Sequence, residues 1–347
     1  MFRSQMKYHP RIGFTYMPGA KTRVPGPNGG YLVRTNSIGF RSDREFEVER
    51  QPGVFRTLLF GDSQTAGDGT SNASRYSDLI EGAVPGLEVF NYGLSGTGPA
   101  QQLLAFEDFA DVDHDLVVIG FYVENIRRAT RGIVKSLDAD GNEAYYAKPF
   151  FRLDGDDLAL ENVPVPKKGW TSETLPEEYR SQIYNYSETN FFSRDDRDKT
   201  PLYESLAKAR PLAPVRKIVK NLAVRLSEYD PLPEYSSADD PSWVLLRRIL
   251  ERWIAASDAP VLLFTIPHHL HLVAPNEPTG YQARFAELAA SSGCHLYDPL
   301  PDLGRLTSAD RRTLWSDEAG HLSRRGHEVF AELLAPVIAG FAGISSE

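Results

Sequence analysis

Cysteine is almost absent from this sequence: Cys294 is the only one among 347 residues, so no disulfide can form within the chain. Cys294 stands beside an apolar residue in a short predicted strand, and we expect a buried thiol with a structural role. The sequence also lacks any run of about 18 apolar residues, the length that a membrane-spanning helix needs. Its first residues contain no apolar stretch of the kind found in a secretory signal. These absences predict a protein of the reducing cytoplasm without a membrane span.

An excess of basic residues is also missing. Lys and Arg number 38 against 47 Asp and Glu, which gives a formal net charge of -9. Nucleic-acid binding and adhesion to anionic lipid both need a basic surface, so neither partner is expected. The hydrophobic content of 41% and the charged content of 24% are those of an ordinary globular protein. The composition thus argues against these two classes of partner.

Four segments of the chain differ in composition, and the length fits a core domain with a sizeable insertion. Residues 1–55 are rich in Gly, Pro and Arg with repeated turn signals, so we expect an extended arm laid over the core. Residues 126–241 are polar, and a structureless loop of that length is unusual in a compact domain. We therefore expect an inserted subdomain or lid between the two parts of the core, residues 56–125 and residues 242–347.

The two core segments alternate short apolar runs with segments of helical character. Runs that are apolar on both faces are typical of strands in a parallel sheet. Strands are expected at residues 57–60, 88–92, 115–122, 260–266 and 294–297, and helices at residues 73–83, 99–109, 242–256, 279–291 and 323–341. Residues 202–226 in the insertion also have helical spacing. Strands that alternate with helices predict right-handed βαβ units and a doubly wound sheet.

Residues able to do chemistry follow the first three predicted strands. Ser63 comes directly after the first strand and enters a helix, at the edge where open α/β sheets bind ligands. The free N–H groups of a helix N-terminus suit a developing oxyanion, although Ser63 is equally well explained as a helix N-cap. Gly96 lies in a glycine-rich turn after the second strand, and Asn125 follows the third. Each of these two is, by itself, more typical of an ordinary loop.

A histidine near the C-terminus completes the set. His321 lies in the last loop before the final predicted helix, shortly after Asp317 and Glu318. A carboxylate in such a turn can accept a hydrogen bond from imidazole Nδ1 and leave Nε2 facing a serine. Most isolated loop histidines have no such role. The order of the four features, however, places all of them on one rim of a parallel sheet.

In this order the four segments resemble the short sequence blocks of the SGNH, or GDSL, hydrolases. Gly61-Asp62-Ser63 is similar to the first block, and the segment from Asn91 to Gly96 is similar to the second. Asn125 and His321 fall where the third and last blocks have their asparagine and histidine. Gly326-His327 resembles the residues that often follow the last block. The resemblance implies a three-layer α/β/α sandwich with a flavodoxin-like parallel sheet and an inserted lid or subdomain.

The resemblance also implies a role for each matched residue. Ser63 would be the nucleophile and His321 its base, and the oxyanion hole would be formed by the N–H groups of Ser63 and Gly96 and the side chain of Asn125. The last block of the family usually has an aspartate three residues before its histidine. In this sequence Glu318 has that spacing and Asp317 has that chemistry. The acid of the triad therefore stays open between these two residues.

The activity that the resemblance implies is serine-dependent hydrolysis of carboxylic esters through an acyl-enzyme, with no metal or organic cofactor. The expected substrate is an acetyl or other short acyl ester of a carbohydrate or small metabolite. An O-acyltransferase with the same Ser-His site is an alternative, because both reactions share the first half-reaction. A non-catalytic binding module that kept the fold is an alternative of a different class. The sequence predicts no oligomeric state.

A histidine-rich segment, Pro267-His268-His269-Leu270-His271, follows the fourth predicted strand. We expect His268 and His269 to contact the substrate. No cysteine or carboxylate joins these histidines at metal-ligand spacing, so no metal site is expected. A dinucleotide-binding enzyme is excluded because the glycine spacing of G-x-G-x-x-G is not met.

Overall fold

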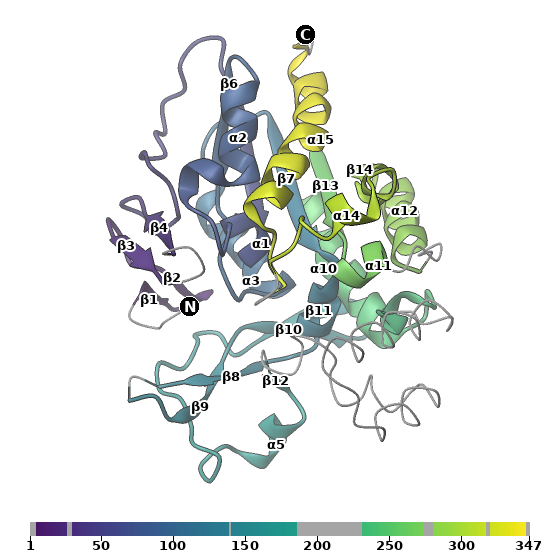
Figure 1. The fold of residues 1–347 in the computed structure, drawn as a ribbon. Helices are drawn as coiled ribbons and strands as arrows, with labels where there is room; N and C mark the ends of the chain where they lie inside the picture. The colour runs from purple at the N-terminus through teal and green to yellow at the C-terminus, as the bar shows by residue number, and fades with distance from the viewer. Residues whose placement is uncertain are drawn as a thin grey trace, which may run out of the picture.

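A parallel sheet of five strands forms the centre of the protein in a computed structural model, which describes residues 5–25, 30–138, 140–185, 231–273, 280–316 and 320–344 (Figure 1). The strands are β5 (Phe55–Gly61), β6 (Leu87–Asn91), β7 (Leu116–Tyr122), β13 (Val261–Ile266) and β14 (His295–Tyr297). They lie in the order β14-β13-β7-β5-β6, and every neighbouring pair is parallel. In chain order this is 2-1-3-4-5, the order of flavodoxin-like sheets.

The apolar runs of the sequence explain which strands lie at the centre of the sheet. Every residue of β7 and β13 is buried, and in β5 only the first residue is partly exposed. Strands buried on both faces need no alternation of apolar and polar residues, because helices cover both sides of the sheet. The central strands were therefore predictable as continuous apolar runs.

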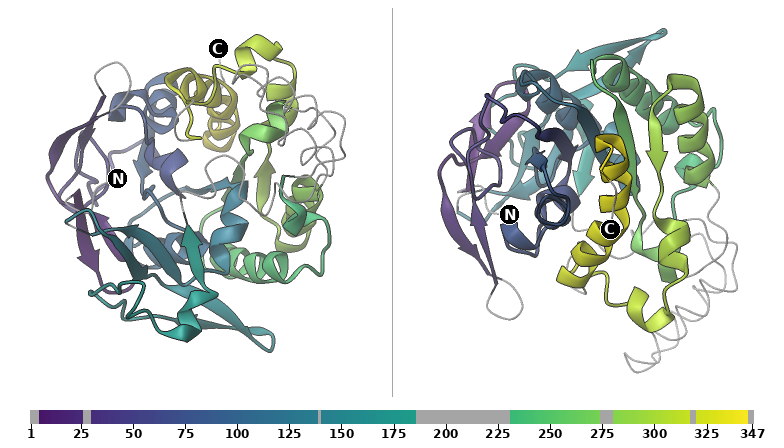
Figure 2. Two further views of the ribbon diagram at one scale, coloured as in Figure 1. Left: turned by 60° about the horizontal axis from the view of Figure 1, so that its bottom comes forward. Right: turned by 90° about the horizontal axis from the view of Figure 1, so that it is seen from above.

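Helices form a layer on each face of this sheet (Figure 2). The helices α2 (Tyr76–Ala83) and α15 (Arg324–Ala342) pack together on one face, and α3 (Pro99–Phe109), α10 (Pro241–Ala255) and α12 (Gly280–Ser292) pack on the other. In α10 the buried side chains recur at helical spacing, and Asp240 caps its first turn by accepting a hydrogen bond from Ser242 N at 2.8 Å. The predicted three-layer α/β/α sandwich with a flavodoxin-like sheet is confirmed.

The predicted core elements begin and end within two residues of the observed ones, with one exception. The helix expected from residue 73 begins at Tyr76, because the backbone of Arg75 is extended and residues 72–74 form a short 3-10 helix. Cys294 is half-buried, whereas we expected a buried thiol. The helix expected at residues 202–226 lies outside the described residues.

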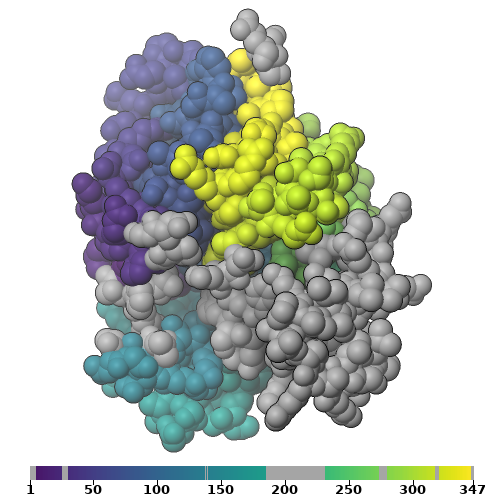
Figure 3. Space-filling view, in the orientation of Figure 1, coloured from purple at the N-terminus to yellow at the C-terminus, as the bar shows by residue number. Residues whose placement is uncertain are grey.

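The N-terminal segment forms two antiparallel hairpins. The strands β1 (Met6–His9) and β2 (Gly13–Tyr16) make the first, and β3 (Lys21–Val24) and β4 (Tyr31–Arg34) make the second. Ile12, Tyr16 and Phe40 are buried in the same apolar core as the central sheet. In Figure 3 this segment (purple) lies directly beside the first part of the α/β core (blue). The segment thus contributes side chains to the main core.

The described part of residues 126–241 contains two small sheets beside the main one. The strands are β8 (Ile133–Leu137), β9 (Glu143–Ala147), β10 (Phe150–Asp154), β11 (Asp157–Glu161) and β12 (Ile183–Asn185), and the short helix α5 (Glu177–Arg180) precedes β12. In Figure 1 these strands lie below the central sheet, on the same side as α1. A separate apolar cluster is formed by Ile133, Tyr145, Ala147, Val165 and Leu175. The division of the chain into an arm, two core parts and an inserted subdomain stays a prediction.

Within the described ranges, no helix combines the length and the apolar character that crossing a membrane requires.

Candidate functional site

The segment that carries Ser63 follows directly from the central strand β5. Asp62 comes next and caps the one-turn helix α1 (Ser63–Ala66), with its Oδ1 accepting a hydrogen bond from Gln64 N at 2.9 Å. A Cβ atom on Gly61 would lie 2.2 Å from Thr65 Oγ1, so only glycine fits between the strand and the turn. Ser63 itself is only 4% exposed. The sequence Gly-Asp-Ser thus places a serine hydroxyl at the carboxyl edge of the sheet.

The structure brings His321 to Ser63. The two residues are 258 positions apart, and His321 Nε2 lies 2.9 Å from Ser63 Oγ. His321 occupies the loop before α15, whose first turn is capped by Ser323 Oγ accepting from Gly326 N at 3.0 Å. Asp317 and Glu318 lie outside the described residues, so the choice between them as the acid behind His321 stays a prediction.

Asn125 is in contact with the segment that carries Ser63. It ends the 3-10 turn η4 (Val123–Asn125), which follows the neighbouring strand β7. The Nδ2 atom of Asn125 donates a hydrogen bond to Asp62 Oδ2 at 3.1 Å, and Asn125 is fully buried. Asp62 therefore holds both the helix that begins at Ser63 and the side-chain amide of Asn125.

The turn that contains Gly96 is also joined to the segment that carries Ser63. Asn91, the last residue of β6, donates from Nδ2 to Thr65 O at 2.8 Å, and Leu94 N donates to Gly61 O at 3.1 Å. Gly96 has a φ of +76°, a left-handed conformation that favours glycine. The second, third and last blocks are thus each hydrogen-bonded to the first one.

Neither a family model nor a curated protein matches the sequence. Among solved structures, a lipolytic protein of the G-D-S-L family from Veillonella parvula matches with 10% identity and a TM-score of 0.40, over 82% of this chain and 99% of its own. A lipase/acylhydrolase from Enterococcus faecalis matches with 15% identity and a TM-score of 0.40, over 83% and 96%. An acetyl xylan esterase matches with 13% identity and a TM-score of 0.40, over 82% and 100%.

The chain resembles the SGNH, or GDSL, hydrolases. This resemblance depends on the sheet order and the four blocks of the chain itself, rather than on the overall likeness to those structures. Several residues that contact these four blocks belong to none of the sequence motifs.

The N-terminal arm reaches the Gly96 turn of the SGNH-like site. The hydroxyl of Tyr16 lies 2.7 Å from Ser95 Oγ and accepts from Ser95 N at 3.1 Å, and Ser95 Oγ donates in turn to Asp68. Burial raises the pKa of Tyr16 above its usual value, so the phenol keeps its proton. Tyr16 therefore anchors the residue just before Gly96. No sequence pattern pointed to this contact, because the two residues are far apart in the chain.

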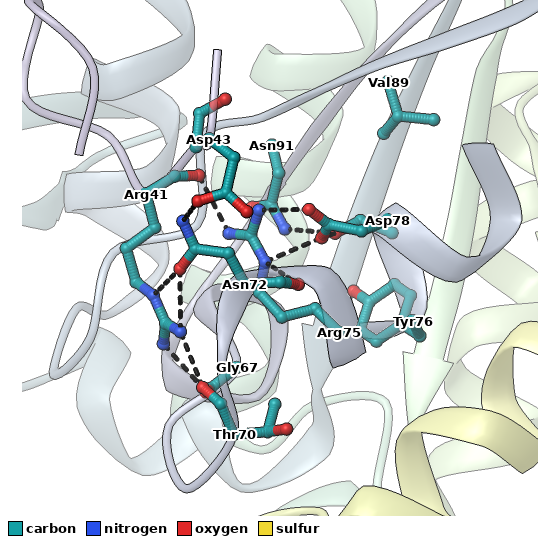
Figure 4. Close-up of polar contacts among 12 residues, drawn as sticks. Arg41, Asp43, Gly67, Thr70, Asn72, Arg75, Tyr76, Asp78, Val89 and Asn91 are labelled. Atoms are coloured by element: carbon teal, nitrogen blue, oxygen red, sulfur yellow. Dashed lines mark hydrogen bonds and ion pairs between the residues drawn. The ribbon is translucent and has the colours of Figure 1, made fainter. Parts of the chain in front are cut away.

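A second residue of the arm holds the loop that follows α1. Arg41 is fully buried and donates to Gly67 O at 2.8 Å and to Thr70 O at 2.7 Å. Figure 4 shows its guanidinium directed at these carbonyls and at Asn72, with Arg75 turned toward Asp78 beside it. Backbone carbonyls that would otherwise be buried without a donor are thus satisfied. Tyr16 and Arg41 thus hold both the turn at Ser95 and the loop that follows α1.

Buried charges surround Asp62. Burial raises the pKa of the Asp62 carboxyl, and the Arg128 guanidinium acts in the opposite direction from 3.3 Å. Arg128 lies in the short helix α4 (Ile126–Ala129) and donates to Thr97 O at 3.0 Å and to Tyr184 Oη at 3.2 Å. Tyr184 belongs to β12, so a strand outside the central sheet contacts the partner of Asp62. Arg128 could not be predicted as a site residue, because its only signal in the sequence is its place three residues after Asn125.

Lys148 is buried next to this cluster. It lies between β9 and β10, and its Nζ donates to Arg128 O at 2.9 Å. Lys148 makes no ion pair within the part of the chain that the structure describes. Burial, together with the positive charges of Arg128 and Arg131, lowers the pKa of Lys148 to about 7. Folding is therefore linked to the protonation state of this amine.

Replacing Lys148 with methionine is expected to change how stability depends on pH. The folded-state pKa of about 7 lies below the usual 10.5, so between these values the unfolded chain binds more protons. The free energy of unfolding of the wild type should therefore rise with pH across this window, by up to about 1.4 kcal/mol per pH unit. The Lys148→Met protein should lack this rise. Urea unfolding of both proteins from about pH 7 to 9.5 measures the difference, and parallel pH profiles would contradict it.

The histidine-rich segment follows β13, and its last residues form the helix α11 (His269–Val273). The ring of His268 is buried and stacks on Tyr122 at 6.2 Å, and the rings of His268 and His269 are 4.3 Å apart. Burial holds the pKa of His268 well below its usual value and lowers that of His271 to about 3, so both rings are neutral. Contact of His268 and His269 with substrate stays a prediction. Among the residues that can be described, no three His, Cys, Asp or Glu side chains are grouped to hold a metal ion.

Proposed function

We propose that this protein is a serine-dependent hydrolase of carboxylic esters. The observation that carries the proposal is the separation of 2.9 Å between Ser63 Oγ and His321 Nε2, at the carboxyl edge of the sheet. A serine hydroxyl is a weak nucleophile until an adjacent base accepts its proton, and this distance is within hydrogen-bond reach. The contact between Asn125 and Asp62 supports the same proposal, because it keeps a side-chain amide donor beside Ser63.

In the proposed reaction His321 acts first as a base and then as an acid. As Ser63 Oγ bonds to the ester carbonyl carbon, His321 Nε2 accepts the hydroxyl proton. Collapse of the tetrahedral intermediate breaks the bond to the alcohol oxygen, which takes the proton from His321. Water attacks the acyl-enzyme by the same route and leaves a carboxylic acid and free Ser63.

The oxyanion of each tetrahedral intermediate is proposed to bind the N–H groups of Ser63 and Gly96 and the side-chain amide of Asn125. The N–H of Ser63 is at the first position of a helical turn, where it has no acceptor within the helix. Donors fixed in place before the reaction stabilise the developing charge without further reorganisation. Asp62 holds the side-chain amide of Asn125, and Tyr16 holds Ser95, the residue before Gly96.

The acid behind His321 is proposed to be Asp317 or Glu318. The variants Asp317→Asn and Glu318→Gln separate the two. The substitution that removes the orienting carboxylate should leave the imidazole in the wrong tautomer and so lower the rate. The other substitution should leave the rate close to that of the wild type.

The proposed substrate is an acetyl or other short acyl ester of a carbohydrate or small metabolite. Residues 126–241 are proposed to bind the acceptor group. Tyr184 of β12 contacts Arg128, and Arg128 contacts Asp62 next to Ser63. The same contact leaves an O-acyltransferase as the second candidate, with a sugar hydroxyl taking the place of water. A cytoplasmic location is proposed with this substrate class.

Product analysis distinguishes the two activities. With 4-nitrophenyl acetate as donor, hydrolysis should release one acetate for each nitrophenol, whether or not a xylo-oligosaccharide is present. A transferase would form an acetylated oligosaccharide, detected by mass spectrometry, at the expense of free acetate. If the wild type neither turns over such esters nor reacts at Ser63 with a fluorophosphonate, a binding module is the better description.

A further inference from the structure

The side chain of Gln64 joins the nucleophile segment to the loop of His321. Its Nε2 donates a hydrogen bond to Gly320 O at 3.0 Å, and its Oε1 accepts one from Leu322 N at 2.9 Å. These two backbone groups flank His321 on either side. One amide side chain therefore holds the histidine's backbone at both ends, from the residue next to Ser63.

The remaining backbone contacts of this loop do not connect it to Ser63. Ser316 N donates to His321 O at 2.8 Å, and Ser323 N donates to Leu314 O at 2.8 Å. These bonds attach the loop to the segment just before it. Apart from the Ser63–His321 pair itself, the Gln64 bonds are the hydrogen bonds that connect residues 320–322 with α1 within the described residues.

Gln64 is in turn held rigidly. It is 2% exposed, and its N–H donates to Asp62 Oδ1 at 2.9 Å. The turn of α1 ends at Gly67 in a left-handed conformation, and Gly67 N donates to Ser63 O at 3.0 Å. Ser63 and Gln64 thus move as one unit. A shift of the His321 loop relative to Ser63 would have to break the buried hydrogen bond from Leu322 N and the partly buried one to Gly320 O. Groups left unpaired away from water are costly.

We propose that Gln64 is a positioning residue that sets the distance and orientation of His321 relative to Ser63, independently of the carboxylate behind the imidazole. The expected loss of rate rests on the proposed function. The expected change in the position of His321 depends only on the hydrogen bonds of Gln64. A base displaced by about 1 Å can cost 10²-fold in rate.

The variant Gln64→Met tests the proposal, because it keeps the side-chain length and removes both hydrogen bonds. We expect kcat for 4-nitrophenyl acetate to fall about 10- to 100-fold with KM little changed. Crystals of Gln64→Met should show Ser63 Oγ and His321 Nε2 farther apart than 2.9 Å. A variant that keeps both its kcat and this distance would overturn the proposal.

The variant Gln64→Glu provides a rescue that a merely structural role would not show. Its ionised carboxylate would face Gly320 O without a proton to donate. Its protonated form has the shape of glutamine and restores both hydrogen bonds, and burial raises the pKa of such a carboxyl. The activity of Gln64→Glu relative to the wild type at the same pH should therefore increase as pH falls. The relative activity of Gln64→Met should not change with pH.

Failure of the proposed function can be told apart from failure of this inference. If the wild type has no esterase activity and no fluorophosphonate labelling, the proposed function fails, and the crystal distance in Gln64→Met still decides whether Gln64 positions His321. If the wild type is active and Gln64→Glu shows no recovery at lower pH, the positioning role is wrong. Thermal unfolding of each variant shows whether a loss of rate only reflects a loss of folded protein.

Discussion

Replacing Ser63 with alanine is expected to lower kcat for ester hydrolysis by about 10⁴- to 10⁶-fold, the range seen when a serine nucleophile is removed. The substitution removes the attacking oxygen and leaves the fold intact. Among the described residues, the hydrogen bond that Ser63 Oγ loses is the one to His321, so stability should change by about 1 kcal/mol at most. Release of 4-nitrophenol measures the rate, and mass spectrometry measures covalent labelling by a fluorophosphonate.

A matched control for this variant is Ser308→Ala, because Ser308 is an exposed serine in α14 (Ser308–Arg311). It should keep the rate and the labelling of the wild type. His321→Ala should be as inactive as Ser63→Ala, and the double variant no worse than either, because the two residues act as a unit. Substantial turnover by Ser63→Ala, or labelling of a different serine, would rule out the proposed mechanism.

Replacing Asn125 with alanine should lower kcat by about 10²- to 10³-fold, the cost of removing one oxyanion-hole donor. KM should change little, because the donor acts on charge that develops only in the transition state. The exposed Asn142 provides a control, and Asn142→Ala should behave as the wild type. A variant of Asn125 that raised KM while keeping kcat would instead indicate a role in binding the ground state.

Asn125→Ala also removes a buried partner of Asp62. Asp62 would keep its contacts with Gln64 N and Arg128, so the carboxylate remains paired. We therefore expect a stability loss of about 1–2 kcal/mol, measured by urea unfolding, which is too small to explain the loss of rate. A much larger loss of stability would mean that the kinetic effect reflects unfolding.

Much of the fold could be predicted from the sequence for a simple reason. The central strands are buried on both faces, so each is a continuous apolar run that local composition reveals. The strands β10 and β11 are short and partly exposed, and such strands carry little pattern. The late start of α2 at Tyr76 depends on Arg75, whose side chain is held by Asp78 and by the carbonyl of Arg41.

The order of the motifs along the chain was enough to identify candidates for the site. Ser63 and Asn125 follow neighbouring parallel strands, whose carboxyl ends share one edge, and His321 was expected at the same rim from its place before the final helix. How these residues are held depends on contacts that form only when the chain has packed. Gln64 bonds to groups more than 250 positions away, and Tyr16 reaches Ser95 across 79. Such contacts leave no periodic or local signal, because they depend on how distant backbone groups meet after the sheet, the arm and the last loop have packed.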